Sequence, residues 1–417
     1  MAKDKIIIFG GDGYLGWTLG LAFANRTNYD IVLADNMIKR QWEKEVGAKS
    51  LVPFQTPLKR IKEYGRIFGK NNLSFEKIDL LDYELVVKII RKHNPAIIIN
   101  AAQQPSAPFS MMNAQNAVAT FSNNIAGHIN VAWAIAETNK NIKYIKLGSA
   151  GCYSGIDTDY IPLGKVNFNF SSKGRARKIK KSWLPMYATD FYHQSKISDF
   201  LINELISDAW KLRVVTTQQS TIFGATIDEN FAEDRRILSA RFNYDAVFGT
   251  VINRFVCQIN MGWPLTIYGD GSQKTGIISL SDTVDNFINI AEKNLVPGIH
   301  EVVHNFTLRP SINEIANMIV AKEGTISISH IENPRKEMKG SLKREVEVHK
   351  AIKGSHKNKD KKIKSELFKL GEFVGRYKNN IDAAVIMPKI LWEKNQDLIK
   401  EKSLKEKYSL IMQQSAQ

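Results

Sequence analysis

The chain has 417 residues, of which 43% are hydrophobic, and it carries 58 Lys and Arg against 42 Asp and Glu, a formal net charge of +16. This length and hydrophobic content predict one large core and a second, smaller one. Two cysteines, Cys152 and Cys257, exclude a disulfide framework, and no metal site is predicted. No apolar run approaches the roughly 18 residues of a membrane span and no signal-like segment comes first, so we expect a soluble cytoplasmic protein.

The N-terminal residues predict a dinucleotide-binding turn. Lys5 to Phe9 is typical of a buried strand, and glycines follow at positions 10, 13 and 16. In such a turn Gly10 allows the tight bend, Gly13 lets the backbone approach a pyrophosphate, and Gly16 lets the helix pack on the strand. The next residues have helical apolar spacing, and the N-terminus of that helix would offer free N–H groups to phosphate. The alternative is a chance glycine-rich turn.

The next apolar run, Asp30 to Asp35, ends in a carboxylate about twenty residues past the glycines, where such an acid bonds the ribose 2′-OH of NAD. A carboxylate there repels the 2′-phosphate of NADP, so NAD is the predicted cofactor. Lys39 and Arg40 follow closely and soften that preference. The alternative for Asp35 is a turn acid at the end of a strand.

Strands and helices alternate through the first half of the chain. Further strands are expected at 73–78, 95–102 and 143–147, and helices at 85–93 and 118–138. This order predicts an α/β fold with a parallel, doubly wound Rossmann sheet. A ligand should lie across the carboxyl ends of its strands, near Gly10 to Gly16, Asp35, Asp79 and Ala101 to Gln104. We expect a Rossmann domain over 1–225, to which the chain returns around 276–305, and a smaller substrate domain over 226–417.

A candidate catalytic set follows the fifth strand. Tyr192 and Lys196 are four residues apart on a predicted helix and therefore share one face. There the ammonium can lower the pKa of the tyrosine, so that the phenolate takes a proton from a sugar hydroxyl while hydride leaves for a nicotinamide. Ser149, at the end of the strand expected at 143–147, can bond the same hydroxyl.

These motifs resemble those of extended short-chain dehydrogenases/reductases, and within that superfamily the chain resembles the UDP-sulfoquinovose synthases over nearly its whole length. The matching stretches are Gly10-Gly-Asp-Gly-Tyr-Leu-Gly-Trp17, Ala34-Asp-Asn36, Ser106-Ala-Pro-Phe-Ser-Met111, Asn123-Asn124, Lys146-Leu-Gly148, Phe191-Tyr-His-Gln-Ser-Lys196, Tyr244-Asp-Ala-Val-Phe-Gly-Thr250, Asn253-Arg-Phe255, Pro264-Leu-Thr-Ile-Tyr-Gly269, Asn333-Pro-Arg335 and Ile386-Met-Pro388.

The resemblance implies an enzyme with bound NAD that oxidises C4 of UDP-glucose, loses the 6-hydroxyl, adds sulfite at C6 and reduces C4 again. Tyr192 would be the base, Lys196 would tune it and Ser149 would orient the sugar. His193 would face the sugar near C6, or would be an ordinary histidine on a helix surface. The resemblance also implies a homodimer formed through the helices at 118–138 and 195–210.

Further site residues are implied by the same resemblance. Those expected to bind NAD are Gly10, Asp12, Gly13, Tyr14, Leu15, Gly16, Asp35, Asn36, Arg40, Asp79, Leu80, Ala101, Asn123, Tyr192 and Lys196. Those expected to bind the UDP-sugar are Gln104, Ser149, Gln219, Thr250, Asn253, Arg254, Thr266, Tyr268, Lys274 and Arg335.

The chain departs from the family at four positions. The family has a glutamate at Cys152, a methionine at Ala150, and arginines at Pro105 and Thr275. A thiol with an ordinary pKa of about 8.5 is a poor substitute for a carboxylic acid in the elimination, so Asp190 or Cys152 would have to do the acid/base work. The missing arginines remove charge from an anion site and from the diphosphate clamp, where Lys274 partly compensates as a point charge.

Two other functions stay open at this point. One is an NAD-dependent nucleotide-sugar epimerase or dehydratase that uses the same C4 oxidation without sulfite. The other is a non-catalytic NAD-binding scaffold that uses the basic C-terminal region, where residues 335–417 hold 21 Lys and Arg against 11 Asp and Glu. The lysine run at 349–366 lacks interleaved aromatic residues, so a solvated face fits it better than a nucleic-acid patch, and no nucleic-acid partner is expected.

Overall fold

A computed structural model describes residues 3–153, 160–161, 164–172, 175–320, 326–332, 345–346 and 356–386. The predicted Arg335 therefore lies outside the described residues. Among the described residues, no helix is both long and apolar enough to cross a membrane.

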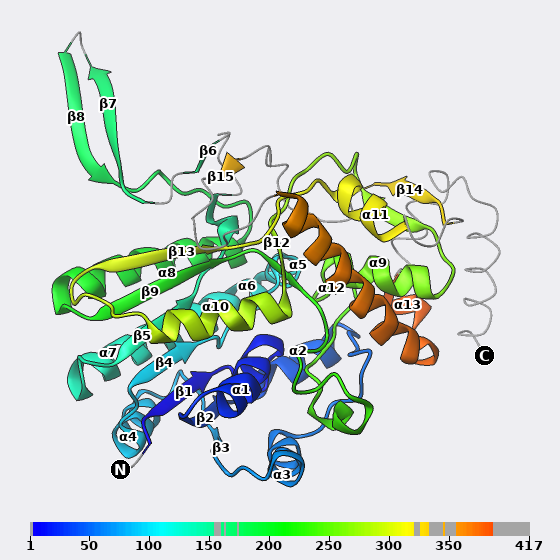
Figure 1. Ribbon diagram of the computed structural model, residues 1–417. Helices are drawn as coiled ribbons and strands as arrows, with labels where there is room; N and C mark the ends of the chain where they lie inside the picture. The colour runs from blue at the N-terminus through cyan, green and yellow to red at the C-terminus, as the bar shows by residue number, and fades with distance from the viewer. Residues whose placement is uncertain are drawn as a thin grey trace.

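A parallel sheet of seven strands organises the molecule (Figure 1), which confirms the predicted fold class. Its order is β13-β9-β5-β4-β1-β2-β3, so the direction of winding reverses between β1 and β4. The strands are β1 (Lys5–Phe9), β2 (Asp30–Asp35), β3 (Leu73–Lys77), β4 (Ile97–Asn100), β5 (Lys143–Leu147), β9 (Arg213–Gln219) and β13 (His300–Asn305). Ile-rich runs such as β1 and β4 are buried on both faces, as parallel strands covered by helices require.

Helices cover both faces of this sheet and enclose two cores. On one face α1 (Tyr14–Arg26) and α10 (Leu280–Glu292) pack with α3 (Pro57–Phe68) nearby. On the other face α4 (Tyr83–His93) and α7 (Gly127–Thr138) pack together, and α8 (Phe191–Trp210) lies beside them. Smaller elements connect them: α2 (Ile38–Glu45), α5 (Ala107–Ser110), η2 (Ala150–Tyr153) and η3 (Glu233–Leu238).

The helix expected at 118–138 is not continuous. It consists of α6 (Ala114–Phe121), a π-helical turn η1 (Ser122–Ala126) and α7. Inside that turn the Asn124 side chain accepts a hydrogen bond from the Gln104 backbone N–H at 2.8 Å and donates one to Ser195 Oγ at 3.0 Å. The interruption thus ties the helix to the start of α8, and apolar periodicity alone does not reveal it.

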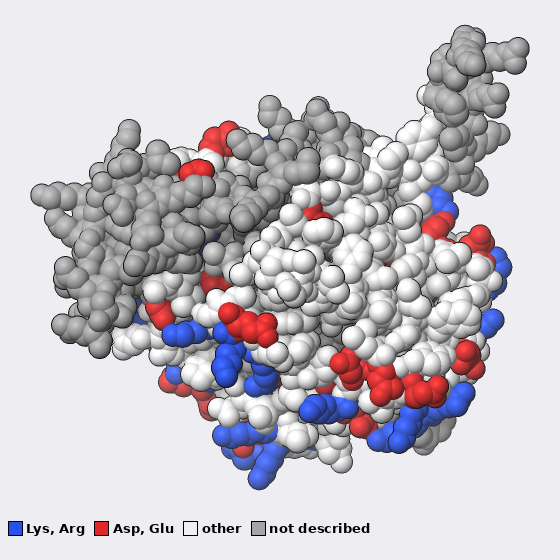
Figure 2. All heavy atoms as spheres, turned by 180° about the vertical axis from the view of Figure 1, so that it is seen from behind, with Lys and Arg blue, Asp and Glu red and all other residues white. Residues whose placement is uncertain are grey.

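A third core lies on the C-terminal side of the sheet. It contains β10 (Thr221–Phe223), α9 (Val251–Asn260), β11 (Leu265–Tyr268), β12 (Ile277–Ser279), α11 (Ile312–Val320), β14 (Ile328–Ile331), α12 (His356–Arg376), η4 (Lys378–Asn380) and α13 (Ala383–Ile386). Much of the lysine run lies on α12, which buries Ile363, Leu367 and Leu370 against this core, while Lys361, Lys362, Lys364 and Lys369 are exposed. On the face drawn in Figure 2, Lys and Arg side chains lie interspersed with Asp and Glu.

A β-hairpin projects from the body near the sheet edge formed by β13 (Figure 1). It pairs β7 (Val166–Ser172) with β8 (Arg175–Ser182), antiparallel, and the sequence analysis did not predict it. A short parallel pair, β6 (Tyr160–Ile161) with β15 (Glu345–Val346), completes the described strands.

Candidate active site

A cavity of about 580 Å³ opens at the carboxyl ends of the central strands. One wall is the loop between β1 and α1; facing it are the ends of β5 and β9, the start of α8 and residues 274–276. A smaller cavity of about 60 Å³ adjoins it beside the end of β2. The pair lies where the sheet reverses direction, which is where open α/β sheets bind their ligands.

The glycine loop has the shape that a pyrophosphate requires. Gly10 has φ +82°, and a Cβ on Gly16 would lie only 2.0 Å from the Gly10 carbonyl oxygen, so the turn and the helix packing both exclude side chains. Helix α1 begins after Gly13, which provides no side-chain cap, and its first N–H groups face the cavity without a competing acceptor from that residue. The residues present fit a dinucleotide.

Asp35 lies at the rim of the smaller cavity, with Asn36, Leu80 and Asn123 in the same lining. Its carboxylate accepts backbone N–H groups from Asp12 at 2.9 Å and from Met37 at 2.5 Å. Burial raises the pKa of Asp35, and these two hydrogen bonds oppose that rise. A carboxylate held in this way at the end of β2 suits the adenosine ribose of NAD.

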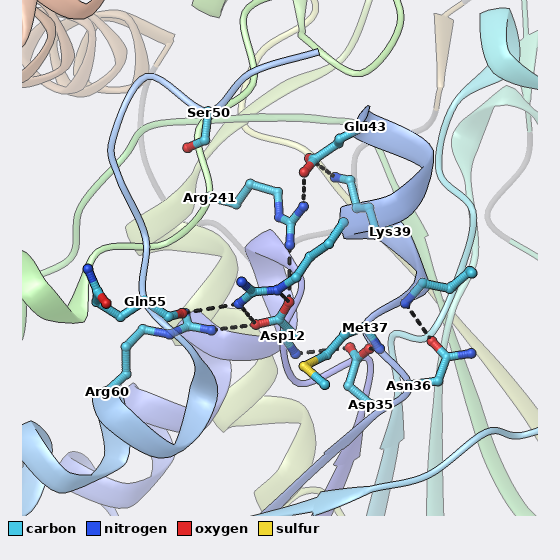
Figure 3. A network of polar contacts seen from close by, with 12 residues as sticks. Asp12, Asp35, Asn36, Met37, Lys39, Glu43, Ser50, Gln55, Arg60 and Arg241 are labelled. Atoms are coloured by element: carbon cyan, nitrogen blue, oxygen red, sulfur yellow. Dashed lines mark hydrogen bonds and ion pairs between the residues drawn. The ribbon is translucent and has the colours of Figure 1, made fainter. Parts of the chain in front are cut away.

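Asp12 anchors a buried charge cluster beneath the glycine loop (Figure 3). Its carboxylate contacts Arg40 at 2.7 Å, Arg60 at 2.7 Å and Arg241 at 3.1 Å. Arg241 continues to Glu43 on α2, and Arg60 stacks 3.8 Å from the ring of Trp17. Arg40, predicted to bind NAD, is thus directed at Asp12 and lines neither cavity.

Lys39 and Arg241 stand between the two cavities and line both. Burial, together with the nearby Arg241, lowers the pKa of Lys39 to about 8. At neutral pH this wall is cationic, which suits the phosphates of a bound dinucleotide.

The predicted catalytic set comes together at the other end of the cavity. Ser149, at the end of β5, and Tyr192, in the first turn of α8, both line it, and their side chains are hydrogen-bonded. Burial raises the pKa of Tyr192 well above its ordinary value, while the bond to Ser149 lowers it. The Lys196 ammonium lies 5.6 Å from the centre of the Tyr192 ring and is completely buried behind it.

A second buried charge cluster lies below this set. Asp199, three residues after Lys196 on α8, contacts the Lys196 ammonium at 2.9 Å and the Lys146 ammonium at 3.1 Å. Its other oxygen lies 2.8 Å from Nδ1 of His128, whose Nε2 lies 3.0 Å from Asn203. Burial alone would raise the pKa of Asp199, but the two lysines and the histidine hold it well below its usual range. Burial lowers the pKa of Lys146 to about 8 and also lowers that of Lys196.

His193 and Asp190 form a dyad that faces the cavity. Asp190 caps α8 by accepting the His193 backbone N–H at 2.8 Å, and its second oxygen lies 2.6 Å from His193 Nδ1. A carboxylate can only accept, so Nδ1 carries a proton and Nε2 faces away from Asp190. A Cβ on Gly151 would lie 2.2 Å from Nε2, so the absence of a side chain at Gly151 makes room for the imidazole ring.

Cys152 does not line the cavity. Its side chain is 0% exposed and packs with Tyr153, Ala188 and Ile197. Burial raises the pKa of the thiol to about 12, so it is protonated at neutral pH and out of reach of a ligand in the cavity. This position suits packing and not acid/base chemistry.

The predicted substrate residues fall into two groups. Gln219, Thr250, Asn253 and Lys274 line the cavity together with Ser149. Arg335 lies outside the described residues, and the remaining four are not part of the lining: Arg254 donates to the Thr266 carbonyl and stacks 3.9 Å from the Tyr268 ring, and Gln104 donates to Thr120 and to the Ser106 carbonyl.

Of the predicted NAD residues, Tyr14 donates its hydroxyl to the Gly224 carbonyl at 2.7 Å and Asp79 accepts the Leu81 N–H at 2.9 Å. Gly10, Gly13, Tyr14, Leu15, Gly16 and Ala101 line the larger cavity. Several other lining residues were not predicted, among them Thr189, Ser220, Thr221, Arg241, Asn243, Phe248, His304, Phe306 and Arg309. Most of them come from segments after position 225, where no local pattern marks a ligand contact.

Comparison with known proteins agrees with this geometry. Residues 6–302 match the model of the NAD dependent epimerase/dehydratase family. The chain belongs to this family. It is therefore an NAD-dependent enzyme of the epimerase/dehydratase type, and its cofactor is NAD.

Two relatives are similar over most of their length. The chain is 31% identical over 400 residues to the chloroplastic UDP-sulfoquinovose synthase of Spinacia oleracea, covering 94% of this chain and 80% of that protein. It is 32% identical over 340 residues to the UDP-sulfoquinovose synthase of Sulfolobus acidocaldarius, covering 80% of this chain and 83% of that one.

Solved structures agree on the fold. A UDP-N-acetylglucosamine 4-epimerase from Methanobrevibacter ruminantium superimposes with a TM-score of 0.62 at 19% identity, over 90% of this chain and all of that one. A UDP-glucuronic acid 4-epimerase from Bacillus cereus, in complex with UDP-glucuronic acid and NAD, gives 0.60 at 16% identity, over 89% of this chain and 99% of that one.

Proposed function

We propose that this epimerase/dehydratase-family enzyme is a UDP-sulfoquinovose synthase, which converts UDP-glucose and sulfite to UDP-sulfoquinovose and water. The observation that carries the proposal is that one cavity is lined both by the glycine loop and by Ser149, Tyr192 and His193. The two synthases that match most of the chain support the same reaction.

In this mechanism Tyr192 works as the base at C4. Its phenolic oxygen removes the proton of the sugar 4-hydroxyl, and Ser149 donates a hydrogen bond that keeps this hydroxyl in place. NAD, when bound, supplies the acceptor and the donor of the hydride at C4. The Lys196 ammonium, 5.6 Å from the centre of the ring, favours the phenolate by its charge and so acts against burial, which raises the tyrosine pKa.

The loss of the 6-hydroxyl requires a base for the C5 proton and an acid for the leaving oxygen, because oxidation at C4 makes the C5 proton acidic. We assign both to His193, whose Nδ1 is held by Asp190 and whose Nε2 lies beside Gly151. Nε2 takes the C5 proton and passes it to the departing 6-hydroxyl, which leaves as water. Asp190 stabilises the imidazolium form, as a carboxylate partner does for other catalytic histidines. Sulfite then adds at C6 of the enone, the C5 carbon regains a proton, and hydride returns to C4.

The test is mass spectrometry of the products after the protein is incubated with NAD and UDP-glucose, with and without sulfite. A sulfonated sugar nucleotide that forms only with sulfite supports the synthase. An isomer of UDP-glucose, or a product that has lost water, in both samples refutes it and identifies an epimerase or dehydratase. Tyr192→Phe should lower any turnover by roughly 10²- to 10⁴-fold, because the proton acceptor is lost.

Asp190→Asn tests the dyad separately. It keeps the helix cap but removes the charge that supports an imidazolium, so we expect the loss of water from C6 to slow while C4 oxidation, followed as NADH absorbance, continues. Equal losses in both steps would contradict the assignment of His193 to the elimination.

We also propose a homodimer formed through α6, α7 and α8. These helices expose large apolar side chains, including Val118 (64%), Trp133 (46%), Leu201 (55%) and Leu205 (62%). Figure 2, which views the molecule from behind, shows a broad area without charged side chains in the middle of that face. Leu201→Glu with Leu205→Glu should give a monomer in sedimentation velocity; a wild-type monomer would contradict the proposal.

A further inference from the structure

Two segments of the chain run side by side in the cavity wall opposite the glycine loop. Residues 274–277 and 308–311 form antiparallel bridges at Lys274 with Ser311 and at Ile277 with Leu308. The Thr275 N–H donates to the Pro310 carbonyl at 3.0 Å, and the Ile277 N–H donates to the Leu308 carbonyl at 2.9 Å. In this register Arg309 stands across from Gly276 and diagonal to Thr275.

Both segments contribute to the same part of the cavity. Lys274, Thr275 and Gly276 line it from the first segment and Arg309 from the second; His304 and Phe306, which precede the second segment, line it as well. Arg309 is only partly buried and lines the cavity. The same wall includes Gln219 and Thr221, and Thr221 Oγ1 lies 3.3 Å from Thr275 Oγ1.

The charges of the lining divide into two groups. Lys39 and Arg241 lie beside the glycine loop, and Lys274 and Arg309 lie in the paired segments; among the described lining residues Asp190 is the single carboxylate. The polar groups nearest the reaction, Ser149 and Tyr192, are uncharged at neutral pH. The cavity therefore offers one cationic wall to each of two phosphate-bearing ligands.

We propose that Arg309, together with Lys274, binds the diphosphate of the sugar nucleotide. A guanidinium fork can donate two parallel hydrogen bonds to phosphate oxygens, whereas a lysine acts as a point charge. Arg309 thus provides, from the neighbouring segment, the arginine that is missing at Thr275. This assignment rests on the proposed function and extends it, because it names the residue that recognises the nucleoside diphosphate.

Calorimetric titration of the NAD-loaded enzyme with UDP and with uridine tests the assignment. Arg309→Gln should weaken the binding of UDP by roughly ten- to a hundred-fold and leave that of uridine unchanged, because only UDP carries the phosphates. Arg66→Gln is the matched control: it removes the same charge from a side chain that is 66% exposed, and it should leave UDP binding unchanged.

A second variant separates a binding role from a structural one. Thr275→Arg, introduced into Arg309→Gln, places a guanidinium diagonally across the paired segments and should recover most of the lost affinity for UDP. Unchanged UDP binding in Arg309→Gln, or an equal loss for uridine, overturns the assignment. Failure of the wild-type enzyme to bind UDP would instead refute the proposed function itself.

Discussion

The two buried charge clusters have the same plan but different chemistry. In each, one carboxylate that is almost completely buried contacts three basic side chains: Asp12 contacts three arginines, and Asp199 contacts Lys146, Lys196 and His128. Both clusters join parts of the chain that are far apart in sequence. They differ in whether the cations can lose their protons at accessible pH.

The choice of arginine or lysine in each cluster matches the position of that cluster in the fold. Arginine stays protonated and holds a fixed fork, so the Asp12 cluster is a permanent brace between the glycine loop, α2, α3 and the segment at Arg241. Lysine and histidine change charge readily when they are buried, and the Asp199 cluster lies directly behind Tyr192. The comparison indicates that arginine occurs where the buried contacts keep a constant geometry, and lysine where the charge near the catalytic tyrosine can change with pH.

Asp12→Asn should have the largest effect on stability. It leaves three guanidinium groups around a neutral amide, and removing one partner of a buried ion pair costs about 3–5 kcal/mol of the free energy of unfolding. Urea denaturation measures this loss. Asp208→Asn, at a side chain that is 83% exposed, should change it by less than about 0.5 kcal/mol. A loss below about 1 kcal/mol in Asp12→Asn would show that the cluster is not a brace.

Asp199→Asn should cost roughly 3 kcal/mol near pH 6, but its deficit should shrink as the pH rises. Without the carboxylate, the pKa values of Lys146 and Lys196 fall further in the folded state, while in the unfolded chain they stay near 10.4. The folded variant then binds fewer protons than the folded wild type, so the deficit shrinks as the pH rises to about 8, where Lys146 of the wild type also loses its proton. The deficit of Asp12→Asn should stay constant over this range; parallel pH profiles of the two variants would contradict the comparison.

Lys146→Met should move the pH profile of turnover without abolishing it. The charge of protonated Lys146 favours the Tyr192 phenolate, so its removal should lower turnover by roughly ten-fold at pH values where the lysine is protonated. Because the pKa of Lys146 is about 8, the two enzymes should differ most below that pH and converge above it. Lys211→Met, at a side chain that is 65% exposed, should leave the profile unchanged.

Arg60→Lys tests the arginine side of the comparison with the charge retained. Lysine cannot stack its head group on Trp17 or donate in a fork, so the free energy of unfolding should fall by about 1–2 kcal/mol. Thermal unfolding followed by calorimetry measures the change. Arg66→Lys on the surface is the control; an equal effect of both variants would mean that the stacking has no role.

Cys152→Ala should have the smallest effect on activity. The charges of Lys196 and Asp199 affect the pKa of the thiol, but the thiol is buried and protonated. We therefore expect kcat to stay within roughly two-fold of wild type. Turnover at saturating substrate is the measurement. A loss as large as that of Tyr192→Phe would place the thiol in the central chemistry.

Much of the nucleotide-binding half could be predicted because its signals are local. Gly10, Gly13 and Gly16 are needed within a single turn, and the four-residue spacing of Tyr192 and Lys196 fixes their common helix face. The interruption at Ser122–Ala126 could not be predicted, because it depends on the contact of Asn124 with Gln104 and Ser195. Apolar periodicity is the same on both sides of it.

The partners of the charged residues had to come from the folded chain. Arg241 lies 229 residues from Asp12, and no sequence pattern around either residue predicts their ion pair. The same holds for Arg40, which looks like a cofactor ligand in the sequence and is paired with Asp12 in the structure. For Cys152, its sequence position suggested chemistry, whereas complete burial assigns it to packing.

By itself the sequence determined the parallel sheet, the phosphate-binding turn, the choice of NAD and the tyrosine and lysine on α8, because each depends on spacing within one or two elements. Only the tertiary structure decided which charges are buried together, that His193 is held by Asp190, and that Arg309 stands beside Thr275. Burial and ion pairing depend on which segments, distant in sequence, come into contact in the fold. The periodicity of residues within one segment does not specify those contacts.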